Sequence, residues 1–314
     1  MASCFAVLWG TLFPVISEAI SGDKISLDAD WYNRLMVPIG LFLLFLTGVG
    51  PLFAWRRTST ESLRRNFMYP GIASVVLVAV LIAAGTRQFY ALISFGFCLF
   101  VALTIFVEFY KGAKSIAAKN QMHLPRAIIE LTHRNTRRYG GYLVHMGIVL
   151  AFIGFTGHAF NKNEVKELDV GDSMKIASFI PGAVYELRMV NLAQGDETNY
   201  SWHRATIAVT RNGEMLGTLS PEKRFYTASK QGTSEVGIRV RPYEDLYLNF
   251  GGMSDDNKRV VIQAYVFPLV SWIWIGTLTV IFGTLVCLVP SKIKLQYART
   301  EVVGYAKKNA TVQK

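Results

Sequence analysis

Long uninterrupted runs of apolar residues are the feature that most constrains how this 314-residue chain can fold. A helix needs about 20 apolar residues to cross the roughly 30 Å hydrocarbon core of a bilayer. With 51% hydrophobic and only 18% charged residues, the composition excludes a soluble enzyme, a fibrous repeat and a disordered chain. The runs approach or reach bilayer length at Ala2–Ile20, Leu35–Trp55, Tyr69–Gly85, Phe89–Phe109, Gly141–Phe160 and Phe267–Val289.

The first apolar run lacks the basic start and the small-residue cleavage site of a secretory signal. We therefore expect an uncleaved membrane-spanning helix at residues 2–20. Because this helix begins abruptly, we also expect that a further segment, or a separate chain, precedes it.

Lys and Arg are distributed unevenly between the polar segments. They far outnumber Asp and Glu in residues 56–68, 110–140 and 291–314, whereas residues 161–266 carry a nearly balanced charge. Since positive loops stay in the cytoplasm, both termini are predicted to be cytoplasmic and residues 161–266 to be exported. The net charge of +11 therefore reflects topology, and no nucleic-acid partner is expected.

The exported segment alternates apolar and polar residues as β-strands do. Asn212-Gly213 between two such runs predicts a tight hairpin, while Gly195-Asp196 and Gly251–Asn257 are predicted to be loops. The predicted strands are Glu164–Val170, Val184–Val190, His203–Thr210, Met215–Leu219, Val236–Val240, Leu246–Phe250 and Val260–Val266.

The predicted fold class is an α-helical integral membrane protein of about six transmembrane helices with an inserted antiparallel β-domain. Five helices are expected in residues 1–160, the β-rich domain in 161–266, the sixth helix in 267–290 and a basic tail in 291–314. Broken helices and midplane charges are missing, which argues against a transporter.

The cysteines exclude two kinds of chemistry. Cys4, Cys98 and Cys287 all fall within apolar runs, so the exported domain has no disulfide. Because neither a Cys-x-x-Cys nor a Cys-x-x-Cys-His motif occurs, a thiol redox role and covalent c-type haem attachment to this chain are both excluded.

One histidine enters the membrane. His145 follows Tyr139 by about 9 Å of helix rise, which places it within the half of the bilayer nearer the basic loop. An ionisable side chain at this depth is costly and is a functional candidate. The alternative is a neutral imidazole that bonds a backbone carbonyl of a neighbouring helix.

The glycines around His145 favour the functional reading. Gly140, Gly147 and Gly154 recur every seven residues and predict close helix packing along one face. His145 lies about 200° around the helix from Gly147, and Gly141 lies one turn before it on its own face. That arrangement leaves room for a flat ligand such as a porphyrin, which fits better than a proton relay.

The remaining polar candidates carry weaker expectations. Arg137 and Arg138 could pair with haem propionates, although they also form the basic flank of a membrane helix. His158 lies about 20 Å beyond His145 and could approach a haem at the membrane surface, although a hydrogen bond at the membrane interface is the favoured explanation for it. Three others are expected to be solvated or at the surface: His123, His133 and His203.

Several ordered motifs resemble the CcmF/NrfE family of cytochrome c maturation proteins. The principal one is Arg137–Gly147, followed by Ile153–Gly157. The others are Gly10–Pro14 with Lys24–Ser26, Gly48–Pro51, Pro221–Tyr226, Asp245–Tyr247 and Trp272–Trp274. They span nearly the whole chain.

The resemblance implies a haem-binding membrane subunit of a bacterial haem lyase, in the inner membrane with residues 161–266 periplasmic. It implies that His145 is one axial ligand of a b-type haem, and that the other ligand and the Trp-rich haem-handling segment belong to an N-terminal half absent here. Ser17 stands where the family has a periplasmic histidine.

The implied partners are that N-terminal half or a split partner, a haem chaperone, apocytochrome c and other maturation subunits. The alternative function is a non-catalytic membrane anchor that presents a periplasmic β-domain to a partner, with His145 as a packing residue.

Overall fold

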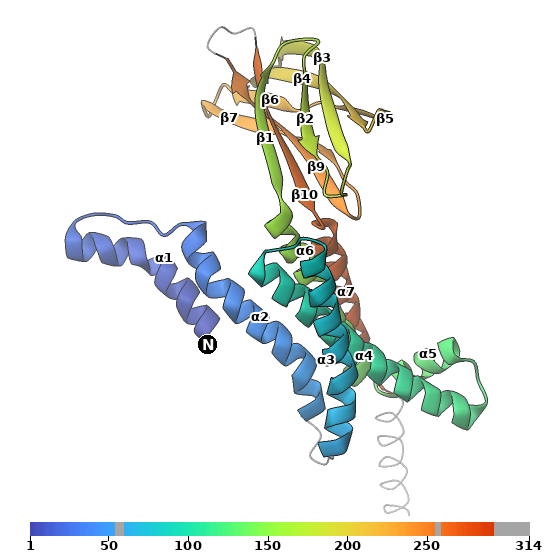
Figure 1. Ribbon diagram of the computed structural model, residues 1–314. Coiled ribbons are helices and arrows are strands. Elements are labelled where there is room, and N and C mark those ends of the chain that lie inside the picture. Colours follow the sequence, from blue (N-terminus) through green and yellow to red (C-terminus); the bar gives the residue numbers. More distant parts are fainter. Residues whose placement is uncertain (54–59, 255–258, 292–314) are drawn as a thin grey trace, which may run out of the picture. The chain divides into compact units, whose positions relative to one another are not determined.

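The computed structural model describes residues 1–53, 60–254 and 259–291 (Figure 1). Its internal contacts divide the chain into two compact units, Met1–Phe152 with Ile275–Lys314, and Ile153–Trp274. The described part of the first unit is helical, and the second is mostly β-structure. Trp55 and all but one residue of the predicted tail lie outside the described residues.

Six of the helices in the described part of the chain are long and apolar enough to cross a membrane, and the short α5 is the exception. Their presence beside an antiparallel β-domain confirms the predicted fold class. The helices are α1 Ala2–Ser21, α2 Ala29–Phe53, α3 Thr60–Ala83, α4 Phe89–Asn120, α5 Leu124–Arg134, α6 Thr136–Gly157 and α7 Ser271–Leu288.

Helix α4 is longer than its apolar run predicts. It continues for about three turns beyond Phe109, because Ala and Lys in the following segment favour a helix even though the lysines end the apolar run. It ends where Gln121 adopts the left-handed conformation, with a φ of 51°. At 32 residues, α4 exceeds what the hydrocarbon core requires.

Helix α5 was not predicted, because it lies within the polar segment 110–140. It is amphipathic and buries Ala127 and Leu131. A Cβ added at Gly112 of α4 would lie 2.9 Å from Leu131 Cδ2, so the glycine lets α5 approach α4 closely.

The packing of α6 on α7 depends on glycine, as the seven-residue spacing predicts. A Cβ added at Gly147 would lie 2.7 Å from the carbonyl oxygen of Gly276, and one at Gly140 would lie 2.6 Å from Cys287 Sγ. On the facing helix, a Cβ at Gly276 would lie 2.6 Å from the Gly147 carbonyl oxygen. These backbones therefore approach as closely as small-residue membrane interfaces allow.

The β-domain is a sandwich of two antiparallel sheets. One sheet has the order β1-β10-β9-β8, and the other has the order β2-β3-β4-β6-β7 with β5 paired to β4. The strands are β1 Lys162–Leu168, β2 Ser173–Ala177, β3 Val184–Asp196, β4 Tyr200–Arg211, β5 Glu214–Leu219, β6 Glu222–Tyr226, β7 Gln231–Glu235, β8 Gly237–Arg239, β9 Glu244–Met253 and β10 Val260–Pro268.

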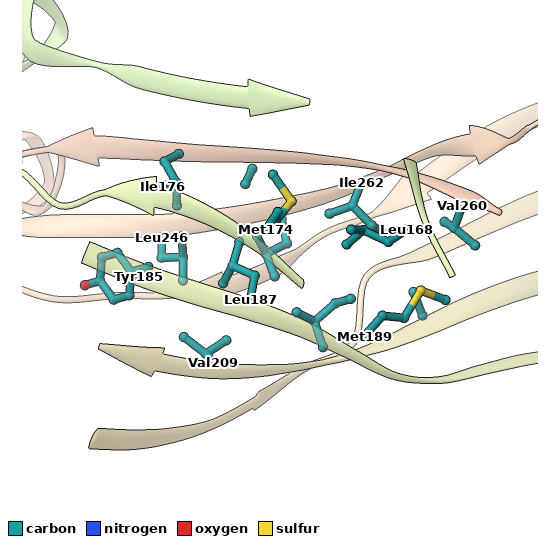
Figure 2. Packing of buried hydrophobic residues seen from close by; sticks show 14 of the residues in the cluster. Leu168, Met174, Ile176, Tyr185, Leu187, Met189, Val209, Leu246, Val260 and Ile262 are labelled. Carbon is teal, nitrogen blue, oxygen red and sulfur yellow. The ribbon is translucent and has the colours of Figure 1, made fainter. Parts of the chain in front are cut away.

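The core of the sandwich is built by alternate residues along the strands, whose side chains point inward between the two sheets. Figure 2 shows side chains such as Leu187, Met189 and Ile262 gathered between the sheets, and all three are buried. This period-two burial forms one apolar core.

Three strands, β2, β6 and β7, were not predicted from the sequence. The last two are rich in polar residues, so they lack a continuous apolar alternation. The Asn212-Gly213 turn is confirmed, since both residues have positive φ, 49° and 87°, as a two-residue hairpin requires.

The prediction of a loop at Gly195-Asp196 is wrong, because both residues belong to β3 and pair with Trp202 and Ser201. The lack of a side chain at Gly195 lets the Trp202 ring pack against the backbone, because a Cβ at this position would lie 2.7 Å from Trp202 Cζ2. The prediction of a loop at Gly251–Asn257 is also wrong at its start, since β9 extends to Met253, and residues 255–257 lie outside the described residues.

Candidate functional site

His145 projects from the middle of α6 and is half-buried. Its Nδ1 atom is buried and has no hydrogen-bond partner within the part of the chain that the structure describes. Buried polar atoms are nearly always hydrogen-bonded, so an exception requires an explanation. The carbonyl bond that would make His145 a packing residue is not formed by this nitrogen.

The space beside His145 is open on its own helix face. A Cβ added at Gly141 would meet no heavy atom within 4 Å. By contrast, Gly140 and Gly147 are in tight contact with α7. Helix α6 therefore has one packed glycine face and one open glycine beside an imidazole nitrogen that lacks a partner.

The described residues contain no group of three or more His, Cys, Asp or Glu side chains that could hold a metal ion between them. A metal at His145 would therefore need donors from outside such a cluster, as a larger bound group can supply. A planar macrocycle with an axial position has this property.

Arg138 of α6 forms an ion pair with a carboxylate on α4. Its Nη2 lies 2.6 Å from Glu108 Oε2 on α4, and its guanidinium lies 5.7 Å from the ring centre of Tyr139 and 5.8 Å from that of Tyr142. Glu108 is the last residue but one of the apolar run Phe89–Phe109, and a lone carboxylate there is the signal that could have predicted an arginine partner. Arg137, in contrast, is exposed on the first turn of α6.

The other four histidines lie on elements other than α6 or in the segments between elements. His158 is exposed in the 3₁₀ turn His158–Phe160 after α6, and His123 and His133 are exposed beside and within α5. His203 is half-buried on β4, with its ring centre 6.5 Å from that of Phe250.

Ser17 has a structural role at the end of α1. Its hydroxyl donates to the Pro14 carbonyl at 3.0 Å and accepts from the Ile25 backbone N–H at 3.0 Å, and the residue is buried. These bonds fasten the chain after α1 back onto the helix. The position where the resemblance implies a histidine is therefore occupied by a side chain that closes a turn.

The Pro221–Tyr226 motif forms an ion-pair cluster in the sandwich. Glu222 is buried and lies 2.6 Å from both Arg204 and Arg224, and Arg224 also lies 3.3 Å from Glu235. Burial alone would raise the pKa of Glu222, but the hydrogen bonds from the two arginines outweigh it and hold that pKa below its usual value. The motif thus joins β4, β6 and β7.

Known proteins are similar both to the β-domain and to the chain over most of its length. Residues 159–268 match the family described as the CcmF C-terminal beta-sandwich. The cytochrome c-type biogenesis protein CycK of Bradyrhizobium diazoefficiens is 27% identical over 93% of this chain and 43% of its own length. The CcmF protein of Escherichia coli is 28% identical over 92% of this chain and 42% of its own length.

A solved structure, that of the cytochrome c heme lyase CcmF, shares the fold with a TM-score of 0.70. It is 22% identical and is matched over 92% of this chain and 44% of its own. The chain thus spans less than half the length of the relatives it matches. Residues 159–268 thus match the CcmF C-terminal beta-sandwich, and over most of its length the chain is similar to CcmF-type cytochrome c-type biogenesis proteins.

Proposed function

We propose that this chain is the haem-binding membrane subunit of a cytochrome c haem lyase and that His145 supplies one axial ligand to a b-type haem. The observation that carries the proposal is the buried Nδ1 of His145, which lacks a hydrogen-bond partner in the described residues, beside the open face at Gly141. The name of the solved relative, a cytochrome c heme lyase, supports the same class of function.

The residues of this chain would have distinct roles. His145 would coordinate iron through one ring nitrogen and fix the orientation of the macrocycle, while Gly141 leaves room for its plane. When bound, haem supplies a redox-active iron within the membrane. Arg137, which is exposed, is the better candidate for a propionate partner, because Arg138 already pairs with Glu108.

The second axial ligand is proposed to come from outside these 314 residues. The chain has five histidines, and the four others lie at helix ends, in the basic segment or on β4. An N-terminal half of the family protein, or a separate partner chain, is the proposed source.

The proposed setting is the inner membrane of a bacterium, with residues 161–266 in the periplasm. There the β-sandwich would face a haem chaperone, apocytochrome c and the other maturation subunits. Haem would be delivered to the Cys-x-x-Cys-His motif of the apocytochrome for covalent attachment, since this chain has no such motif.

The test is His145→Ala in the complex that contains this chain and the N-terminal partner. We expect the b-type absorption spectrum to be lost or reduced at least tenfold per mole of protein, because one of two axial bonds is removed. The protein should still insert, since alanine makes α6 more apolar. Added imidazole should restore part of the spectrum by filling the vacant position.

His158→Ala and His203→Ala are the matched controls, and both should retain the haem. A normal six-coordinate spectrum in His145→Ala would refute the ligand assignment. It would favour the alternative function, a membrane anchor that presents a β-domain to a partner and in which His145 packs between helices.

A further inference from the structure

A cavity of about 590 Å³ is lined by residues of α3 and α4, which lie side by side (Figure 1). It is remote in sequence from His145 and its helix. The polar residues on its wall are Asn66, Tyr69, Tyr110, Lys111, Lys114 and Ser115.

The hydropathy of the two helices places this cavity at the level of the lipid headgroups. The apolar span of α3 has one limit at Asn66, and the apolar run of α4 ends at Phe109. Lys111 Nζ donates a hydrogen bond to Asn66 Oδ1, so these two limits lie at the same depth. Tyr69 and Tyr110 are exposed there, as aromatic residues at a membrane–water interface commonly are.

The charge of the cavity is positive. Lys111 and Lys114 both line it, and neither forms an ion pair with a carboxylate among the side chains that the structure describes. Lys114 Nζ lies 5.8 Å from the ring centre of Tyr110, which holds the ammonium group near the wall. No carboxylate is among the residues that line the cavity.

We propose that this cavity binds the headgroup of an anionic phospholipid, with the phosphate between Lys111 and Lys114. The amide of Asn66 and the hydroxyls of Tyr110 and Ser115 supply further hydrogen bonds within the same wall. Basic pockets between membrane helices are suited to such headgroups. Pro70 and Val107 complete the wall with apolar surface, which suits the start of the acyl chains better than a free phosphate ion.

The experiment compares the affinities of the purified full chain for phosphatidylglycerol and phosphatidylcholine in mixed micelles, read by native mass spectrometry. A lysine near a membrane surface contributes about a fivefold gain in affinity for anionic lipid. Lys111→Gln with Lys114→Gln should therefore weaken phosphatidylglycerol binding about 25-fold and leave phosphatidylcholine binding unchanged. Lys119→Gln removes a charge from the same helix outside the cavity, and should change neither affinity.

A second variant guards against a folding defect in the first. Ala118→Trp keeps both lysines but fills the cavity that Ala118 lines, and should also abolish the preference for phosphatidylglycerol. The proposal is overturned if the double variant keeps that preference or if Lys119→Gln weakens binding equally. It is also overturned if inorganic phosphate displaces the lipid at equal concentration, because the site would then recognise the ion alone.

Discussion

At the scale of single residues, Glu244 shows how the β-sandwich accommodates a carboxylate with no solvent exposure. It accepts hydrogen bonds from Ser178 Oγ at 2.5 Å, from the Phe179 N–H at 2.5 Å and from the Tyr185 hydroxyl at 2.9 Å. An unpaired buried carboxylate would be strongly destabilising. The three donors therefore fix the start of β9 against the loop after β2 and the start of β3.

Tyr185 provides a test of this cluster. Burial, and then the hydrogen bond to Glu244, raise the pKa of Tyr185 to about 12. An unfolded tyrosine titrates near pH 10, so the folded state gains stability that is complete below pH 10 and is lost as the pH rises to 12. The difference between the folded and unfolded pKa values of Tyr185 corresponds to about 2–3 kcal/mol in the free energy of unfolding.

In an ultraviolet titration of the folded protein, Tyr185 should ionise in a late step near pH 12. Tyr185→Phe should remove that late step, and the alkaline loss of stability between pH 10 and 12 should shrink accordingly. Superimposable titration curves for the two proteins would contradict the assignment.

The ion pair between Arg138 and Glu108 marks the limit of residue-level prediction. The sequence places both residues near one end of their membrane helices, but the pairing requires α4 and α6 to be neighbours. Helix adjacency is a tertiary property that hydropathy does not encode. Arg138 was consequently predicted to be a propionate candidate equal to Arg137, although the structure shows that it already has a carboxylate partner.

At the scale of elements, the two kinds of glycine on α6 predict opposite consequences of the same substitution. Gly147→Leu should separate α6 from α7, because a Cβ there would lie 2.7 Å from the Gly276 carbonyl oxygen. We expect a fall in melting temperature of several degrees in detergent, consistent with a cost of about 1–3 kcal/mol for overpacking.

Gly141→Leu is the matched variant, since a Cβ at Gly141 meets no heavy atom within 4 Å. It should leave the melting temperature nearly unchanged, yet reduce haem binding in the complex by occupying the space beside His145. Equal thermal destabilisation by both variants would contradict the two-faced description of α6.

The elements themselves were predictable to the extent that burial follows a simple period. The membrane helices and the apolar strands β3, β9 and β10 follow from hydropathy and alternation. The strands β6 and β7 do not, because they are rich in polar residues, and the buried Glu222 of β6 is paired with arginines instead of packed among apolar neighbours. Helix α5 was missed because only one narrow face of it is apolar.

The β-sandwich is predicted to fold without the membrane helices. Its core consists of residues from its own strands, and the cysteines of the chain lie outside it, so neither a disulfide nor a metal is needed. The isolated segment 159–270 should give a far-ultraviolet spectrum dominated by β-structure and a cooperative melting transition. A helical or random-coil spectrum would show that the sandwich depends on the rest of the chain.

At the scale of the whole molecule, the distribution of basic residues and the number of membrane-spanning helices together predict the membrane topology. Six helices can span the membrane, and the non-spanning α5 lies between α4 and α6 within a strongly basic segment. An even number of spans returns the chain to its starting side. The basic segment at 110–140 and the end of α7 should therefore share one side of the membrane, and the β-sandwich should occupy the other.

Reporter fusions can test this arrangement in cells. Alkaline phosphatase is active only after export, whereas green fluorescent protein becomes fluorescent only when it is retained in the cytoplasm. Fusions after Lys162 and after Lys24, which lies between α1 and α2, should both be phosphatase-active, because each follows an odd number of spans. Fusions after Gln121 and Ser291 should fluoresce instead. Lys24 is the informative control, since its loop is short and weakly charged and its position depends on α1 spanning the membrane. A fluorescent fusion at Lys162 would invert the β-sandwich to the cytoplasm, and its proposed contacts with exported apocytochrome would then be impossible.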